Sequence, residues 1–173
     1  LLSILANPFS LSGGFRGPDQ LDDSKALFDE KLEMWVAPFI MAPINTKNIH
    51  RSNALMGHAY GEDFCYDEMS ITGSGDEGKA RAEFMATLNP LVGDDMPAPG
   101  EGPSKESREN GNFNVLFCAD MPNGETLNAT VTGDMDPGYG STSKMIAESA
   151  VCLVKDCLEL EGGIYTPAPS MGK

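Results

Sequence analysis

The side chains most able to bind a charged ligand lie in one polar stretch, residues 45–53. Asn45, Arg51 and Ser52 supply an amide, a guanidinium and a hydroxyl there. If the stretch is helical, Arg51 falls on an otherwise apolar face that begins at Ile44. Because a guanidinium stays charged, an arginine on such a face needs a carboxylate or phosphate partner. The pattern therefore predicts either a bound anion or an internal salt bridge at Arg51.

Other parts of the chain carry groups that bear on this site. Glu68 and Asp136 are the candidate partners for an internal salt bridge. Arg108 follows a loop punctuated by glycine and proline, residues 99–104. Either this loop has a function, in which its backbone amides contact a ligand or the loop closes over a cleft, or it is a solvated crossover loop. Tyr139 ends a Pro-Gly turn, where it serves as a proton donor or as a packing residue.

The sequence lacks the motifs of several common catalytic and nucleotide-binding sites. It has no GxGxxG after a strand, no GxxxxGK[ST], no GxSxG, no HExxH and no EF-hand loop. The glycines of residues 73–75 are too closely spaced for a dinucleotide fingerprint and predict a turn. His50 and His58 lie two helical turns apart, so we expect two unrelated surface histidines and no metal site. The cysteines form no CxxC pair and are expected to be four buried thiols, at Cys65, Cys118, Cys152 and Cys157.

Composition and charge narrow the classes of function. The 173 residues suit one domain, and the formal net charge is −14, from 26 acidic and 12 basic residues. Such a charge repels nucleic acid and anionic membranes, so we expect neither as a partner. No apolar run reaches the length of about 18 residues that indicates a membrane span, and the first residues carry no signal-peptide pattern. We therefore expect a cytoplasmic protein without a membrane span.

The clearest local structure is a β-hairpin over residues 112–133. Apolar residues alternate on both sides of Asn123-Gly124, a dipeptide that strongly indicates a hairpin turn. A long helix is expected after the hairpin, from about Ser141 to Glu161. Apolar residues cover a broad face of this segment, and Gly162-Gly163 can end the helix.

The remaining elements follow from periodicity and from the positions of glycine and proline. Helices are expected over residues 22–33, 43–56 and 76–88. Strands are expected over residues 62–72 and 164–166, and a long loop over residues 89–111. The apolar face of the third helix is expected to run through Phe84. No alternating βαβ pattern occurs. The order predicts an α+β fold with a mixed, mostly antiparallel sheet and helices packed on one face.

An ordered series of residues extends through almost the whole chain, from about residue 7 to residue 173. Its members are Trp35–Ala42, Asn45, Arg51–Leu55, Tyr60–Gly61, Phe64–Glu68, Pro99–Ser104, Arg108, Gly111, Gly133, Asp136–Tyr139, Glu148–Ala150 and Gly162–Pro167. The series resembles the C-terminal part of saccharopine dehydrogenase-like oxidoreductases, the group that includes the trans-acting enoyl reductases. The order of the residues carries the resemblance, and no single motif within it is diagnostic.

The resemblance implies a parent protein with an N-terminal NAD(P)-binding Rossmann domain that this chain lacks. Residues 1–173 would then form one domain for substrate binding and dimerisation, inactive alone, with the missing domain, a small-molecule substrate and a second copy as partners. The chain would return to the Rossmann domain after Met171-Gly172. No catalytic residue carries over from the family. We expect the substrate cleft to involve Asn45, Arg51, Ser52, Arg108 and Tyr139.

Two other readings remain open at this point. The chain is either a stand-alone interaction domain without an enzymatic parent, or a small-ligand carrier in which the loop over residues 89–111 acts as a lid. The substrate is equally open, since an enoyl thioester, an imine and a keto acid all fit the resemblance.

Overall fold

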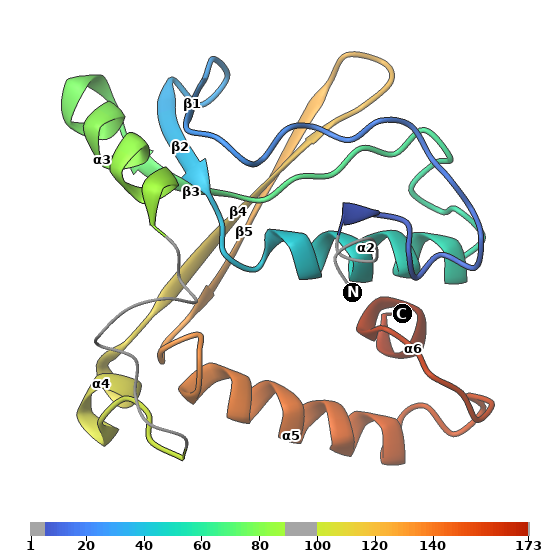
Figure 1. Cartoon of the computed structure of the whole chain (residues 1–173). Coiled ribbons are helices and arrows are strands. Elements are labelled where there is room, and N and C mark those ends of the chain that lie inside the picture. The colour runs from blue at the N-terminus through green and yellow to red at the C-terminus, as the bar shows by residue number, and fades with distance from the viewer. Residues whose placement is uncertain (1–5, 89–99, 173) are drawn as a thin grey trace. The chain divides into compact units, whose positions relative to one another are not determined.

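The computed structural model describes residues 6–88 and 100–172 (Figure 1). Two compact units make up the chain. The first unit combines Leu1–Asp94 with Glu161–Lys173, and the second is Asp95–Leu160. This division does not test the prediction of one substrate-binding and dimerisation domain over residues 1–173, which stays a prediction. Much of the expected long loop, residues 89–99, lies outside the described residues.

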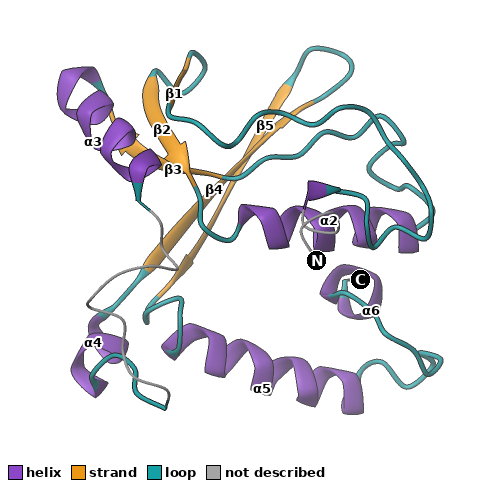
Figure 2. Cartoon of the chain, in the orientation of Figure 1, coloured by secondary structure: helices purple, strands orange, loops and turns teal. Residues whose placement is uncertain are grey.

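A three-stranded antiparallel sheet belongs to the first unit (Figure 2). In sheet order its strands are β1 (Leu27–Asp29), β2 (Met34–Pro38) and β3 (Met69–Gly73). The register between β2 and β3 shifts beside Trp35, which leaves Thr72 as one extra residue on β3. Thr72 is buried, and its hydroxyl lies 2.9 Å from the carbonyl oxygens of both Trp35 and Gly78. The bulge thus ties β2, β3 and the following helix together.

Helix α3 (Gly75–Thr87) packs against this sheet through small residues. Gly78 and Ala82 are buried, whereas Phe84 is 64% exposed. A Cβ atom on Gly78 would lie only 2.2 Å from the carbonyl oxygen of Gly73, so the helix approaches β3 more closely than any other residue would allow. The expected helix is confirmed, but the expected apolar face through Phe84 is wrong.

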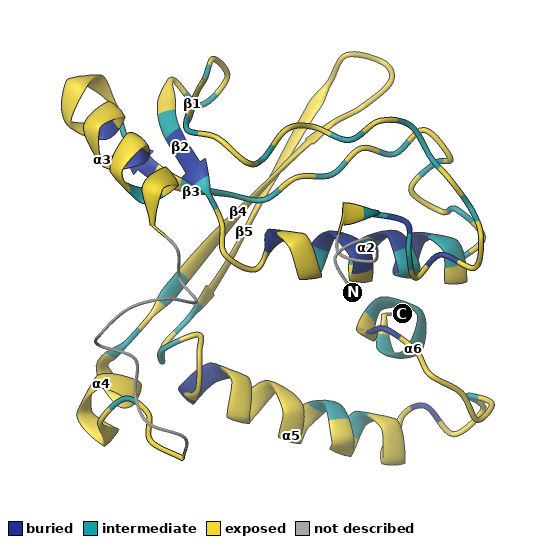
Figure 3. Ribbon diagram, in the orientation of Figure 1, coloured by how far each residue is buried: buried dark blue, intermediate teal, exposed yellow. Residues whose placement is uncertain are grey.

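Helix α2 (Ala42–Leu55) confirms the helix expected from Pro43, which sits in its first turn. The expected apolar face is wrong, because Ile44 is 48% exposed and Leu55 is 42% exposed. Figure 3 shows buried residues gathered along α2 and β2. The buried residues of α2 are mostly polar, namely Ala42, Thr46, Lys47, His50, Ser52 and Asn53. Hydrogen bonds to the surrounding loops, more than apolar contact, therefore position this helix.

The second unit contains a two-stranded ribbon and two helices. They are α4 (Lys105–Asn110), β4 (Phe113–Asp120), β5 (Thr126–Gly133) and α5 (Gly140–Lys155). The antiparallel pairing of β4 with β5 confirms the predicted hairpin. Its turn includes Gly124 at φ 86°, a left-handed conformation that glycine adopts without strain. The long helix is also confirmed, although it ends at Lys155 and not at Glu161. All described strand pairs are antiparallel, which confirms the α+β class.

The helix expected over residues 22–33 is wrong, because this segment forms β1 and turns into β2. The Oδ1 atom of Asp29 accepts the backbone N–H groups of Lys31 and Leu32, both at 2.9 Å. Glu33 then adopts φ 53°. An aspartate that bonds the N–H groups two and three residues ahead closes a turn and competes with helix formation.

Two expected strands are also corrected. Of residues 62–72, only Met69 onward forms a strand, and residues 62–68 are loop. Residues 164–166 form no strand and lead into the short helix α6 (Pro167–Met171), which contacts α2. None of the described helices is both long enough and apolar enough to cross a lipid bilayer.

We predict that Gly78→Ala destabilises the first unit by about 1–3 kcal/mol, because the added methyl group has to displace backbone at Gly73. Urea unfolding of the two proteins measures the difference. Glu83→Ala is the matched control on the exposed side of the same helix, where only a long surface ion pair to Lys79 at 3.8 Å is lost. Its effect should stay within about 0.5 kcal/mol. Equal losses in the two variants would contradict the close approach.

Candidate functional site

Gln20 joins three separate parts of the first unit through its side chain. Its Oε1 atom accepts the backbone N–H of Tyr66 at 3.0 Å and lies 2.9 Å from the Nε2 atom of His50. Because the carbonyl oxygen of Gln20 can only accept, His50 is the donor in the second bond. The Nε2 atom of Gln20 donates to the carbonyl of Pro18 at 2.9 Å. This carboxamide thereby fixes the N-terminal segment, α2 and the chain leading to β3.

His50 is buried against aromatic rings, so the expectation of two surface histidines is wrong for it. Its side chain is 3% exposed, with ring centroids 4.4 Å from Phe9 and 5.8 Å from Phe64. Burial lowers the pKa of His50, since the charged imidazolium loses hydration there. His50 is therefore a neutral hydrogen-bond donor near pH 7.

A second set of hydrogen bonds converges on the carboxyl group of Glu68. The Nδ2 atom of Asn45 donates to Oε2 at 2.9 Å, and the phenol of Tyr66 donates to Oε1 at 2.5 Å. Burial and then the contact with Glu68 raise the pKa of Tyr66 far above its usual range. Tyr66 thus keeps its proton and acts as a donor. Asn45, a predicted substrate-binding residue, belongs to this set.

Two aspartates with shifted pKa values, Asp23 and Asp67, interact electrostatically with Glu68, and Lys47 interacts with Asp23. We define the carboxylate cluster as Asp23, Asp67 and Glu68, with Lys47 as its cation. Burial raises the pKa of Asp23, and burial together with the charge of Asp23 raises the pKa of Asp67. Burial lowers the pKa of Lys47, although Asp23 opposes this shift. Shifted pKa values of this kind gather at functional sites, so the cluster is the candidate site of the chain.

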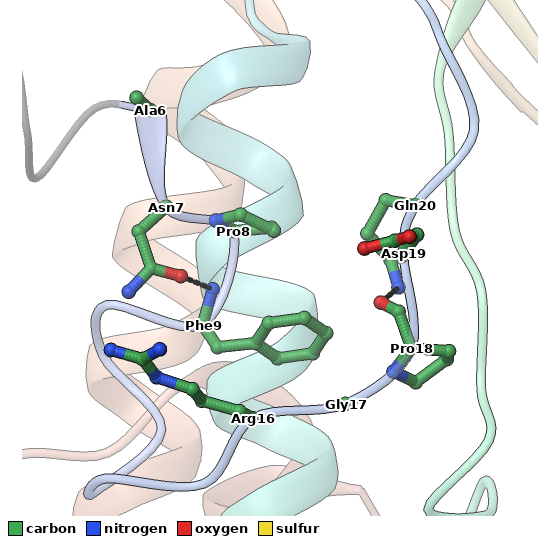
Figure 4. A pocket seen from close by; sticks show the side chains of 9 residues that line it. All are labelled: Ala6, Asn7, Pro8, Phe9, Arg16, Gly17, Pro18, Asp19 and Gln20. Carbon is green, nitrogen blue, oxygen red and sulfur yellow. Dashed lines mark hydrogen bonds between the residues drawn. The ribbon is translucent and has the colours of Figure 1, made fainter.

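An open hollow of about 600 Å³ lies beside the N-terminal segment (Figure 4). Figure 4 shows the ring of Phe9 pointing toward the stretch of chain that carries Pro18, Asp19 and Gln20. Arg16 supplies a cation at the rim and Asp19 an anion. Gln20 lines this hollow and also bonds Tyr66, so it connects the hollow to the carboxylate cluster.

Arg51 and Ser52 use their hydrogen-bonding groups within the first unit. The guanidinium of Arg51 donates to the carbonyls of Leu11 at 3.0 Å and Ile164 at 2.7 Å, so the internal salt bridge expected at Arg51 is replaced by bonds to backbone. The hydroxyl of Ser52 lies 2.6 Å from that of Thr166. Together they hold α2 against the segment that precedes α6, and their predicted role in substrate binding stays a prediction.

Arg108 and Tyr139, the other two predicted binding residues, lie in the second unit. Both side chains are exposed, and a Cβ atom on Gly102 would lie 3.6 Å from the ring of Tyr139. Asp136 stabilises this turn, because its carboxylate accepts the N–H groups of Gly138, Tyr139 and Gly140. Desolvation works against ionisation there, yet these N–H groups hold the pKa of Asp136 below its usual range.

Sequence reasoning missed Tyr66 and Lys47 as members of the candidate site, and it considered Glu68 only as a salt-bridge partner. Residues 64–71 alternate in a pattern that predicts a strand, and a strand assigns no site role to the polar side chains of this segment. The available signal was Tyr66 and Glu68 two residues apart, a spacing that places both on one side of extended chain. Within residues 6–88 and 100–172, no three His, Cys, Asp or Glu side chains are arranged to hold a metal ion.

The chain thus has an α+β fold with antiparallel sheets and a carboxylate cluster whose members are half-buried or exposed. No family model and no solved structure matches the chain. It is 37% identical over 166 residues to a protein of Mycobacterium tuberculosis (strain H37Rv) provisionally named a trans-acting enoyl reductase. That alignment covers 86% of this chain and 40% of the relative. It is also 32% identical over 164 residues to the trans-acting enoyl reductases of Mycobacterium ulcerans (strain Agy99) and Mycobacterium bovis (strain BCG), covering 84% of this chain and 39% of each.

These relatives support a place for the chain in an enoyl reductase-like group. The chain spans about 40% of the length of the curated relatives that it matches.

We predict that the stability of the chain falls below about pH 6.5 partly through His50. Its pKa is lowered in the folded state from 6.5, so the unfolded chain binds the extra proton first as the pH falls. The His50 contribution is complete above pH 6.5 and declines by up to about 1.4 kcal/mol per pH unit until the folded pKa is reached. Urea unfolding between pH 5 and pH 8 should show a shallower slope in His50→Gln. His58→Asn is the control that keeps the Gln20 contact, and an unchanged slope in His50→Gln would refute the assignment.

We predict that Arg51→Met lowers the free energy of unfolding by about 1–2 kcal/mol, because two backbone carbonyls lose a charged donor. Arg108→Met is the matched control on an exposed arginine and should change it by less than about 0.5 kcal/mol. Thermal and urea unfolding compare the two variants. A neutral effect of Arg51→Met would show that the two carbonyls do not depend on this residue.

Proposed function

We propose that this chain is the substrate-side part of an enoyl reductase-type, NAD(P)-dependent oxidoreductase and that it is inactive alone. The observation that carries this proposal is the similarity to trans-acting enoyl reductases, which covers 86% of this chain but only 40% of the relative. The relation to saccharopine dehydrogenase-like oxidoreductases is part of the same proposal.

The proposal assigns cofactor binding to the remainder of the parent protein. The 173 residues contain no dinucleotide fingerprint, and a nicotinamide cofactor normally needs the glycine-rich turn of a Rossmann domain for its pyrophosphate. The proposal also includes a Rossmann domain in the same parent chain, a homodimer and a cytoplasmic location. It is compatible with either NAD or NADP as the cofactor.

The proposal gives the carboxylate cluster the task of orienting the substrate. Reduction of an enoyl group adds a hydride to one carbon and a proton to its neighbour, so the substrate has to be held firmly against the nicotinamide. Asn45 offers a second N–H group beside the one that it donates to Glu68, so it is a hydrogen-bond donor for a substrate carbonyl. The single O–H of Tyr66 is donated to Glu68, so Tyr66 holds the carboxylate that positions Asn45. Arg51, Ser52, Arg108 and Tyr139 remain further candidates for substrate contacts.

The division of labour is tested by calorimetry on this chain with NADPH. We expect no binding, because the phosphate-binding elements belong to the rest of the parent. Tight binding of NADPH by the 173-residue chain would refute the division.

The role of the site is tested in the longer protein that the proposal requires. Tyr66→Phe and Glu68→Gln should each lower kcat/KM for enoyl-thioester reduction by at least about tenfold, since each removes one member of the substrate-orienting set. The consumption of NADPH is the measurement. Glu83→Gln on the exposed side of α3 is the control and should leave the rate unchanged. Normal rates in Tyr66→Phe and Glu68→Gln variants of unchanged melting temperature would remove the carboxylate cluster from the site.

The hollow beside Phe9 supports a second candidate, a small-ligand-binding or interaction domain without enzymatic activity. Its volume of about 600 Å³ falls in the range of small-molecule pockets. This alternative expects an acyl thioester to raise the melting temperature of the isolated chain, because a ligand that binds only the native state stabilises it. The rise in melting temperature should be smaller in Arg16→Gln. No rise at any thioester concentration would refute this alternative, and only the reductase proposal would remain.

A further inference from the structure

Two cysteines meet at the C-terminal end of α5 in the second unit. The Sγ atoms of Cys152, in the last turn of the helix, and Cys157, just beyond it, lie 3.9 Å apart and share a hydrogen bond. Cys157 is buried and Cys152 is half-buried, whereas Cys65 and Cys118 are exposed. The expectation of four buried thiols is therefore wrong for Cys65 and Cys118, and the side chains at 152 and 157 form a dithiol pair.

The two sulfur atoms of this pair are near enough for a small movement to join them. A disulfide bond needs the two sulfur atoms about 2 Å apart, so the thiols have roughly another 2 Å to close. The helix ends at Lys155 and the chain turns at Asp156, so the end of the helix lies between the two cysteines. A small rotation of the side chains and of this last turn completes the approach.

We propose that Cys152 and Cys157 form a reversible intramolecular disulfide, a redox modification site that takes low-molecular-weight disulfides such as oxidised glutathione as its oxidant. The thiolate of Cys152 attacks one sulfur of the oxidant, forms a mixed disulfide and expels the first small thiolate. The thiolate of Cys157 then attacks the Cys152 sulfur and expels the second. The two protein thiols lose two electrons and two protons, and the oxidant is reduced to two thiols.

The surroundings set the speed of this reaction. Burial and then the hydrogen bond that the Cys152 thiol makes to Cys157 raise the pKa of Cys152, so its thiolate is scarce near neutral pH. The first exchange step is therefore slow, and the second is fast because both sulfurs already sit together. The pair responds to sustained oxidation more than to brief exposure. This inference is independent of the proposed enzymatic function.

The sequence allows a direct test, because Lys155 lies between the two cysteines. The whole chain is equilibrated with oxidised and reduced glutathione, alkylated and digested with trypsin. Cleavage after Lys144 and Lys155 separates residues 145–155 from residues 156–173. The proposal expects these two peptides to run as one linked species in mass spectrometry until a reductant is added. Alkylation at both positions should fall by at least about tenfold in the oxidised sample.

Variants make the outcome decisive. Cys157→Ser should abolish the linked species and leave a stable glutathione adduct on Cys152. The double variant Cys65→Ser/Cys118→Ser is the control and should form the linked species as readily as the original chain. Continued full alkylation at both positions under oxidising conditions would overturn the proposal. Links from Cys152 or Cys157 to Cys65 or Cys118 in place of the expected one would overturn it as well.

Discussion

The first unit depends on the carboxamide of Gln20, which binds two distant parts of the chain with one oxygen atom. It accepts from His50 on α2 and from the backbone of Tyr66, while its own nitrogen donates to Pro18. Losing a half-buried acceptor that serves two donors is costly, because both donors would then lack this partner. Arg51 repeats the arrangement farther along the helix, where one guanidinium binds carbonyls of two other segments. Polar side chains thus hold α2 in place where apolar contact was expected.

The sequence predicted those elements whose signals are local. The hairpin of β4 and β5 follows from alternation and an Asn-Gly turn, and α2 follows from a proline in its first turn. The segment from residue 22 to residue 33 failed because the carboxylate of Asp29 forms hydrogen bonds that close a turn, an outcome that composition alone does not reveal. The faces of α2 and α3 failed for another reason. Glycine, alanine and polar residues make the close contacts, so the usual rule that apolar residues face inward selected the wrong side.

The candidate site was only partly predictable for a related reason. Asn45 was selected from its place in a polar helical stretch, and the structure places it on Glu68. The other members of the site come from two loops, at residue 23 and at residues 66–68, and only folding brings these loops together near α2. Sequence spacing gives no measure of burial, yet burial is what shifts the pKa values of Asp23, Lys47, Tyr66 and Asp67. The sequence correctly indicated that the guanidinium of Arg51 needs partners. A bound anion or a carboxylate was expected, whereas two backbone carbonyls accept its hydrogen bonds.

The ribbon of β4 and β5 has a consequence for local motion. Val115, Phe117 and Leu127 are all exposed on it, and each of its strands pairs with only one neighbour. A ribbon of this kind has little to hold it closed beyond its own ladder of hydrogen bonds. Its amide protons should therefore exchange with solvent sooner than those around Thr72, where a bulge, a helix and two strands share one hydroxyl. Local opening should therefore be more frequent in the ribbon of the second unit than around the bulge of the first.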